Sequence, residues 1–399
     1  MLRVVGELRG SGRSLPVAVG AAVLLAACGD DADPTGPGRA PGLAAIVMAA
    51  GTDHSCLIAE DGAAYCWGWG RRGQLGGGDT ADASRPRRVD GGSAFVAISA
   101  GGATTCALTP VGTAYCWGSN HRGALGAGVS APFSTVPLPV AGGYAFAQVS
   151  LGGGHACGTT ANGIGYCWGD GADGRLGTGD RGDRDGPAPV AGGIRFRHLS
   201  AGLFHSCGLA TSGEAYCWGA NRQGQLGTGD TAASAVPRRV GGGLNFIAID
   251  AGNFHTCAVA ADSTAYCWGA NHTGELGDGT TSPTPQTLPR PVSGNRRFAR
   301  IDVGSYHACG VTAAGAAWCW GVNTYGKLGE GTALPTAVPL AVEGGITFDA
   351  VTAGGNHSCG VSVGRRAYCW GWNAVGQLGD GTIETRPSPV PVTSPASGP

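Results

Sequence analysis

Fourteen cysteines recur along the chain in seven pairs, and the two members of every pair are ten residues apart. A Trp-Gly dipeptide follows the second cysteine of each pair, and a histidine lies two positions before the first cysteine in six of the seven. Paired cysteines can form disulfides, and cysteines with a histidine can bind a metal ion such as zinc. The pairs are Cys56 with Cys66, Cys106 with Cys116, Cys157 with Cys167, Cys207 with Cys217, Cys257 with Cys267, Cys309 with Cys319, and Cys359 with Cys369.

The spacing favours disulfides over metal binding. Each pair flanks a turn-forming segment and is equidistant from its tip, as directly opposed residues of a β-hairpin are. Opposed residues of this kind bring their Cα atoms within disulfide reach. The rival metal site would use the repeated histidines, but the second repeat has Thr104 in their place, and exposed thiolates oxidise outside the cytoplasm. We therefore expect seven disulfides, no metal ion, and hydrogen bonds from the six histidines to neighbouring turns: His54, His155, His205, His255, His307 and His357.

Cys28 is the one cysteine outside the pairs, and it follows a short apolar run from Leu15 to Ala27 with three arginines before it. This pattern is typical of a signal peptide, and the run is too short to span a bilayer. The residues Leu25-Ala26-Ala27-Cys28 resemble the bacterial lipobox, which predicts lipidation of Cys28. An ordinary signal peptide with an incidental cysteine is the alternative. Gly29, rather than Asp, follows Cys28, which favours the outer membrane over the inner one.

The expected domain organisation follows from these features. Residues 28–42 are rich in Asp, Pro, Gly and Ala and have no apolar periodicity, so we interpret them as a flexible tether. The repeats fill the rest without a compositional break. The predicted segments are a lipoprotein signal peptide at 1–27, the tether at 28–42, one repeat domain at 43–393 and a disordered tail at 394–399, in an exported protein facing the periplasm or the outside.

The repeats determine the fold class. Each unit is about 50 residues long and contains four short strand candidates bounded by Gly or Pro; in the second repeat these are Phe95–Ser99, Thr104–Leu108, Thr113–Trp117 and Pro137–Val140. Four strands in a period of this length make one propeller blade. We predict an all-β protein, a seven-bladed β-propeller of four-stranded antiparallel blades.

Side-chain alternation predicts how blades pack together. In the first unit, Tyr65 and Trp67 lie on one face of a strand, and Ala64 and Cys66 lie on the other. We expect the bulky Tyr/Trp face of one blade to pack on the small Ala/Cys face of its neighbour. This role accounts for the recurrence of tryptophan after every second cysteine.

The repeat resembles that of the regulator of chromosome condensation family. The fourth unit carries the resemblance most fully, with His205, Trp218, Gly219, Asn221, Gly224, Gln225, Leu226, Gly227 and Gly229. The resemblance implies a seven-bladed ring closed by its N- and C-terminal strands, which we expect to complete one shared blade from Leu43–Met48 and Pro387–Val392. It also suggests guanine-nucleotide exchange on a small GTPase, a role that export and the absence of basic tails argue against.

The composition excludes some function classes. The formal net charge is −1, so the chain has no basic footprint for nucleic acid. No Ser/His/Asp spacing, unpaired nucleophilic cysteine or acidic pair stands out, so we predict no enzyme activity and no cofactor. The loop 180–185 contains three aspartates and an Arg-Gly-Asp tripeptide, which are weak indications of calcium binding or adhesion.

The remaining hypothesis is a binding scaffold, monomeric and attached to the membrane only by its lipid. Loops after each Leu-Gly-x-Gly differ where the rest of the unit repeats, and such variable loops are typical of a recognition rim. The expected partner is an envelope or extracellular protein; the alternative is a glycan or the cell wall. The candidate binding rim comprises Trp69, Arg71, Arg72, Tyr325 and Trp372.

Overall fold

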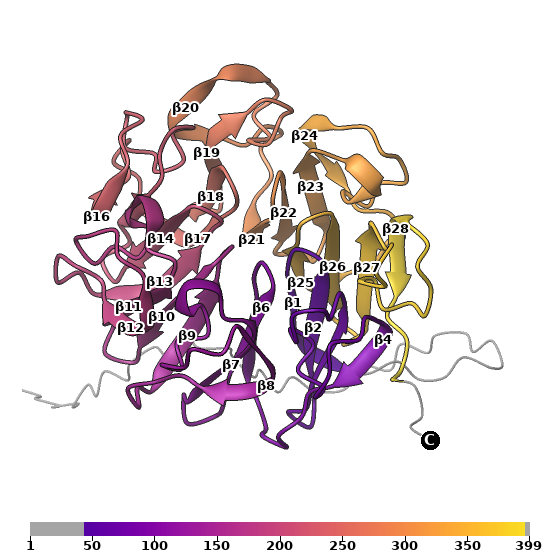
Figure 1. Cartoon of the computed structure of the whole chain (residues 1–399). Helices are drawn as coiled ribbons and strands as arrows, with labels where there is room; N and C mark the ends of the chain where they lie inside the picture. Colours follow the sequence, from indigo (N-terminus) through magenta and orange to yellow (C-terminus); the bar gives the residue numbers. More distant parts are fainter. Residues whose placement is uncertain (1–43, 396–399) are drawn as a thin grey trace, which may run out of the picture. The chain divides into compact units, whose positions relative to one another are not determined.

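The computed structural model describes residues 44–395. The predicted signal peptide, Cys28 and nearly all of the tether lie outside the described residues, as do the last four positions. Within the described part, 28 strands form seven four-stranded antiparallel sheets arranged as a ring (Figure 1). The prediction of an all-β, seven-bladed propeller is confirmed.

Every blade consists of four consecutive strands, numbered from the innermost outward. Blades 1 to 3 are β1 (Ala45–Ala50), β2 (His54–Ala59), β3 (Ala64–Gly68) and β4 (Ala83–Arg88); β5 (Ala97–Ala100), β6 (Thr104–Leu108), β7 (Ala114–Ser119) and β8 (Phe133–Pro139); and β9 (Phe146–Leu151), β10 (His155–Thr160), β11 (Gly165–Gly169) and β12 (Arg184–Pro189).

Blades 4 to 7 follow the same order. They are β13 (Phe196–Ala201), β14 (His205–Ala210), β15 (Ala215–Gly219) and β16 (Ser234–Arg239); β17 (Phe246–Ala251), β18 (His255–Ala260), β19 (Ala265–Asn271) and β20 (Ser282–Pro291); β21 (Phe298–Val303), β22 (His307–Thr312), β23 (Ala317–Gly321) and β24 (Thr336–Ala341); and β25 (Phe348–Ala353), β26 (His357–Ser362), β27 (Ala367–Gly371) and β28 (Arg386–Pro391). Three short 3₁₀ helices lie in loops: η1 (His121–Gly123), η2 (Ala172–Gly174) and η3 (Thr324–Gly326).

The hydrophobic core lies between blades rather than inside one. In a representative cluster, Trp117 of blade 2 packs with Cys56, Ala64 and Cys66 of blade 1, and Tyr115 contacts the same cluster. The same arrangement of a Trp against the cysteines of the preceding blade occurs at all seven junctions. The predicted packing of the Tyr/Trp face on the Ala/Cys face is therefore confirmed.

The cysteines of each pair are directly opposed in register on the second and third strands, with Cα atoms 4.0–4.1 Å apart. Every one of the fourteen is fully buried, so the disulfides join the two central strands of each blade within the inter-blade core. All seven pairs are bonded as the sequence predicts: Cys56 to Cys66, Cys106 to Cys116, Cys157 to Cys167, Cys207 to Cys217, Cys257 to Cys267, Cys309 to Cys319, and Cys359 to Cys369.

The predicted shared blade is wrong. Strand β1 belongs to the first sheet and β28 to the last, and the two do not pair. The last repeat supplies its own innermost strand, β25, so no strand has to be borrowed. The ring closes instead by side-by-side packing of β1 on β25 and β26 (Figure 1), with the backbone N–H of Ala45 donating to the carbonyl of Arg365.

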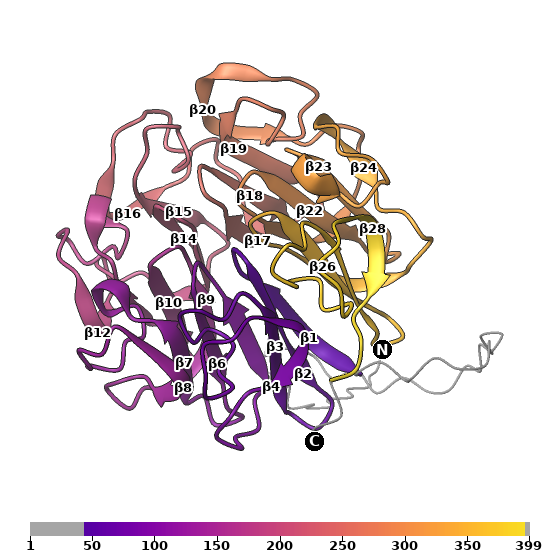
Figure 2. The same cartoon turned by 45° about the vertical axis from the view of Figure 1, so that its right-hand side comes forward.

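The outermost strand of every blade contains at least one proline, as in β4 with Pro86 and β28 with three prolines. Proline has no N–H to donate, so it is tolerated on an edge strand and prevents another strand from pairing there. Figure 2 shows these strands at the periphery of the ring. The sequence thereby protects all seven exposed edges from strand addition.

Candidate binding surface

Three connections join the four strands of each blade: the first links strands one and two, the second links strands two and three, and the third links strands three and four. These connections divide the ring into two faces. In all seven blades, the residue after Trp-Gly donates its N–H to the carbonyl of the residue that ends the first connection, at 2.8–3.0 Å, as Trp69 does to Asp53. The first connection and the start of the third connection therefore lie together. We call the side formed by these segments the loop face, and the side formed by the second-to-third strand turns and the links between blades the hairpin face.

A channel at the centre of the ring opens on the loop face. It is lined by the first connections of all seven blades and has an empty volume of about 400 Å³, part of which is open solvent. Close backbone contacts between neighbouring blades narrow it. A Cβ atom at Gly152 would come within 1.9 Å of the carbonyl oxygen of Gly202 in the next blade, so only glycine fits there.

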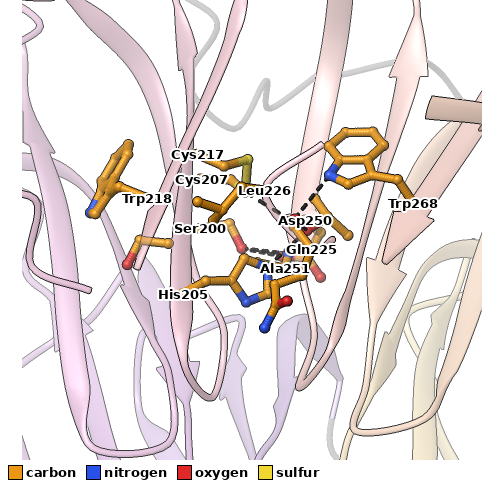
Figure 3. Close-up of a disulfide and its surroundings, with 12 residues drawn as sticks. Ser200, His205, Cys207, Cys217, Trp218, Gln225, Leu226, Asp250, Ala251 and Trp268 are labelled. Atoms are coloured by element: carbon orange, nitrogen blue, oxygen red, sulfur yellow. Dashed lines mark hydrogen bonds between the residues drawn. A yellow bond between two sulfur atoms is a disulfide. The ribbon is translucent and has the colours of Figure 1, made fainter. Parts of the chain in front are cut away.

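A repeated hydrogen-bond network, which we call the latch, fixes the loops to the blades. At the junction of blades 4 and 5, the hydroxyl of Thr256 donates to the carbonyl of Gln225 at 2.8 Å and lies 2.8 Å from Nε2 of His205. The indole of Trp268 donates to the same carbonyl at 2.9 Å, beside the disulfide of Cys207 (Figure 3). One loop carbonyl therefore accepts two hydrogen bonds from the next blade.

The latch corrects the expectation for the repeated histidines. Their partner is a strand hydroxyl of the next blade, rather than a turn, because the ring places each histidine opposite the residue before the next first cysteine. Five junctions have this His–Ser/Thr contact: His54–Thr105, His155–Ser206, His205–Thr256, His307–Ser358 and His357–Ser55.

The two exceptions correspond to two substitutions in the repeat. Ala156 and Ala308 replace the hydroxyl residue in blades 3 and 6. At the first exception, the residue opposite Ala156 is Thr104 rather than a histidine, so no imidazole is left without a partner. His255 faces Ala308, and its Nε2 is buried without a hydrogen-bond partner. The junction of blades 5 and 6 is thus the one where a repeated histidine and the following tryptophan, His255 and Trp320, lack their latch partners.

Burial keeps these histidines neutral. It lowers the pKa of His54 and His255 to about 4 and that of His205 and His357 to about 3. Each latch hydroxyl uses its own hydrogen for the loop carbonyl, so the histidine must donate from Nε2–H. The Nδ1 atoms of the five latch histidines are correspondingly buried without a partner.

The innermost strands are joined by a second set of bonds around the channel. Asp250 accepts hydrogen bonds from the Ser200 hydroxyl and from the N–H of Val303, both at 2.6 Å, and Asp302 accepts from the N–H of Ala353 at 2.7 Å. Ser200 and Asp250 are seen side by side in Figure 3. Burial raises the pKa of Asp250 to about 6. These carboxylates hold adjacent blades in register.

Two aromatic clusters lie on this rigid loop face. The rings of Phe204, Phe254 and Tyr306 follow one another over blades 4, 5 and 6, with centroids 5.2 and 6.0 Å apart. We call these three residues the aromatic stair. Arg175 lies over Phe204, with its guanidinium carbon 5.4 Å from the ring centre. The second cluster, across blades 6 and 7, is a pair of rings 6.0 Å apart, Tyr325 and Trp372.

Charge is unevenly distributed between two halves of the loop face. In blades 4–7, the loop-face segments contain five aromatic residues and one formal charge, Arg222. In blades 1–3, the equivalent segments contain one aromatic residue, Trp69, and six formal charges. The segments compared are 51–53, 69–73, 101–103, 119–123, 152–154 and 170–174 for the charged half, and 202–204, 220–224, 252–254, 270–274, 304–306, 322–326, 354–356 and 372–376 for the aromatic half.

The structure brings together only some of the predicted rim residues. Tyr325 and Trp372 contact each other, and Tyr325 is 45% exposed. Trp69 is half-buried and lies with exposed Arg71 and Arg72 on the charged half, where Arg71 pairs with Asp82 at 3.4 Å. All five belong to the loop face.

Sequence reasoning missed the aromatic stair. Its residues occupy the position directly before the repeated histidine, which reads Asp, Ala, Gly, Phe, Phe, Tyr and Asn over the seven units. An aromatic residue in three consecutive units was the available indication. It becomes meaningful only when the ring places consecutive units side by side.

The acidic loop 180–185 uses its carboxylates internally. Asp180 accepts hydrogen bonds from Arg184 and the N–H of Gly182, and Asp183 accepts from Arg122 and the N–H of Gly171. Within residues 44–395, no three His, Cys, Asp or Glu side chains converge as a metal site.

Comparison with known proteins identifies the family. A family model described as "RCC1-like domain" matches residues 78–398, and one described as "Regulator of chromosome condensation (RCC1) repeat" matches residues 46–74. The chain belongs to the RCC1-like domain family. Propellers of this family are typically binding or regulatory scaffolds.

The curated relatives of this RCC1-like domain match it over about one repeat. The Ultraviolet-B receptor UVR8 of Arabidopsis thaliana is 48% identical over 48 residues, and the human RCC1 domain-containing protein 1 is 44% identical over 46 residues. These alignments cover 12% of this chain and 11% and 12% of the relatives, respectively.

Solved structures share the fold over most of the RCC1-like domain. Human WBSCR16 superposes with a TM-score of 0.76 at 23% identity, covering 84% of this chain and 95% of that one. Yeast RCC1 (Prp20), solved bound to Kap60, gives 0.74 at 20% identity, covering 94% and 92%. A second structure of Prp20p from Saccharomyces cerevisiae, whose binding to Gsp1p and histones was characterised, gives 0.70 at 22%, covering 80% and 83%.

Proposed function

We propose that this RCC1-like domain is a non-enzymatic protein-binding scaffold, displayed on a bacterial envelope through a lipid at Cys28, and that it binds its partner with the loop face. The observation that carries the proposal is the aromatic half of that face. Five aromatic residues gather there in segments with a single formal charge. The centre of a protein–protein interface is enriched in Phe, Tyr and Trp and depleted of charge, and its rim is polar.

The rigidity of this surface supports the same proposal. The latch and the disulfides fix the loops before any partner binds, so few side chains have to be ordered on association. Tyr306 and Tyr325 are 41% and 45% exposed, and each offers a large apolar ring with a hydroxyl group. Yeast RCC1 (Prp20), a solved protein of this fold, was crystallised bound to another protein, Kap60.

Two observations support export, the buried disulfides and the lipobox-like residues before Cys28. Seven buried disulfides are typical of proteins in oxidising compartments. In the part of the chain that the structure describes, no helix has the length and apolarity needed to cross a lipid bilayer. The lipobox-like residues before Cys28 supply the proposed anchor, with the outer membrane as the favoured location.

Crosslinking in native cells tests the proposal. A photo-reactive residue at Tyr306, which is 41% exposed, should capture a discrete envelope protein, and the added double substitution Phe254→Ala/Tyr325→Ala should abolish that product. The matched control replaces two exposed aliphatic residues of outer strands, Val236→Ala and Val338→Ala, and should retain it. Equal capture by both variants would exclude the aromatic half as the binding surface.

The aromatic stair favours glycan binding as the second candidate. Consecutive tilted rings can stack on sugar rings, and the same set of loops contains Asn253 and Asn356. Binding of purified cell wall that is abolished by Phe254→Ala, with no protein crosslink from Tyr306, would establish this candidate over the first.

A further inference from the structure

The hairpin face of blades 4–6 carries an excess of arginine. Its segments 190–198, 211–214, 239–248, 261–264, 292–300 and 313–316 contain six arginines and two carboxylates. Backbone contacts join neighbouring segments on this surface: the N–H of Thr211 donates to the carbonyl of Arg195, and Arg297 bridges to Thr264. We call this surface the arginine patch, formed by Arg195, Arg197, Arg239, Arg296, Arg297 and Arg300.

Four of these arginines have no carboxylate partner among residues 44–395. The two carboxylates are already paired, Glu214 with Arg239 at 2.7 Å and Asp262 with Arg297 at 3.1 Å. The four unpaired arginines have different surroundings. Arg195 and Arg197 donate only to backbone carbonyls. Arg296 lies over the ring of Trp318, 3.8 Å from its centre, and Arg300 is exposed. The patch therefore has a net formal charge of +4, and four of its arginines form no ion pair within the described residues.

Exposed apolar side chains recur on the hairpin face, and two of them, Ile247 and Ala299, lie within the patch. Six blades have a phenylalanine near the start of the innermost strand, and blade 1 has Ala45 at this position. The residue that follows it is exposed in every blade and is apolar in five of them. Three of these side chains are large: Ile46, Val96 and Ile247 are 41%, 45% and 46% exposed. In the patch itself, blade 5 contributes Ile247 and blade 6 contributes Ala299, which adjoins Arg300 in sequence.

The remaining blades of this face are not basic. Their segments 60–63, 88–97, 109–113, 140–147, 161–164, 342–350 and 363–366 contain three arginines and five carboxylates. A negatively charged surface would therefore contact the ring in a tilted orientation, with blades 4–6 closest. Ala44, the first described residue, also lies on the hairpin face, where it bridges to Arg366.

We propose that the arginine patch, with Ile247 and Ala299, docks on the anionic headgroups of a phospholipid bilayer. Arginine binds phosphate oxygens with charge-assisted hydrogen bonds, and aliphatic side chains beside basic ones are typical of proteins that lie on a membrane surface. The segment that precedes Ala44 carries the proposed lipid anchor. Docking by the hairpin face directs the aromatic half of the loop face away from the membrane, where a partner can reach it. The cellular setting rests on the lipid anchor of the proposed function, but the patch itself is tested without it.

Vesicle binding by a non-acylated chain tests this docking. The full mature chain with Cys28→Ser should co-sediment with vesicles containing phosphatidylglycerol and not with vesicles of phosphatidylcholine alone, and added salt should weaken the binding. The variant R195Q/R197Q/R300Q should bind roughly a hundredfold more weakly, at roughly fivefold per arginine. The matched control, R85Q/R181Q/R222Q, removes the same charge from exposed positions outside the patch and should bind like the parent chain.

Each other result overturns the docking proposal. Equal affinity for both kinds of vesicle would exclude headgroup charge as the determinant of binding. An equal loss of affinity in the control variant would show that binding depends on the net charge of the protein rather than on the patch. Tight binding to heparin without binding to phosphatidylglycerol vesicles would assign the patch to a different polyanion. Because none of these variants alters Phe254 or Tyr325, the protein-crosslinking result stands or fails separately.

Discussion

Completing the latch in blade 6 should stabilise the propeller. At this junction Ala308 occupies the position of the latch hydroxyl, Nε2 of His255 is buried without a partner, and the indole N–H of Trp320 is unsatisfied as well. The substitution Ala308→Ser adds one oxygen atom at a position where five other blades carry a Ser or Thr against a histidine. We expect the new hydroxyl to accept from His255 and to donate to the carbonyl of Glu275.

The magnitude follows from the bonds gained. A net intramolecular hydrogen bond contributes about 1 kcal/mol, and satisfying a buried unpaired group contributes about 1–3 kcal/mol. We expect the free energy of unfolding to rise by about 1–2 kcal/mol. For a large domain this raises the Tm by about 2–4 °C per kcal/mol, with a ring of this size at the lower end.

Two matched variants complete the test, measured by thermal and denaturant unfolding with the disulfides intact. Ala156→Ser places the same hydroxyl opposite Thr104, where there is no histidine, and should gain less than half as much. Ser206→Ala removes the partner of His155 and should cost about 1–3 kcal/mol. If Ala308→Ser is no more stable than Ala156→Ser, and Ser206→Ala costs nothing, the latch does not stabilise the ring.

Three further outcomes are expected. The buried histidines, such as His54 with a folded pKa of about 4 against 6.5 unfolded, should make stability fall as the pH drops below 6.5 towards 4, because the unfolded chain binds more protons; unfolding midpoints measured from pH 7 to 4 check this. A strong thiol reductant should leave the buried disulfides intact until denaturant is added, by thiol labelling, and Cys207→Ala/Cys217→Ala should cost roughly 2–3 kcal/mol of stability. Gly152→Ala should prevent soluble expression or lower the Tm sharply, because its Cβ would lie 1.9 Å from a backbone oxygen, whereas Gly364→Ala, with its nearest atom at 3.8 Å, should behave as the parent chain.

The features that the sequence predicted correctly are those that repeat. The Cys–Cys register follows from a turn midway between two residues of one hairpin, and the packing of Trp117 on Cys66 follows from strand alternation. Both depend on contacts within one unit or between identical units. Local spacing is sufficient to determine them.

What the sequence did not predict depends on how units meet. The partner of His205 is Thr256, about one full repeat away, and only the register between blades brings them together. The aromatic stair likewise needs three units side by side. The shared-blade closure failed because the terminal unit already contains a complete innermost strand, β25, which the family resemblance alone does not reveal.

The seam between the last and first blades has a consequence for chain connectivity. No peptide link crosses it, yet His357 contacts Ser55, Trp67 donates to the carbonyl of Gln377, and Ala50 donates to the hydroxyl of Thr352, the same contacts that occur at the linked junctions. The contacts between neighbouring blades therefore form without a peptide link between those blades. A circular permutant that joins the present termini and begins at another blade boundary should therefore fold into the same closed ring.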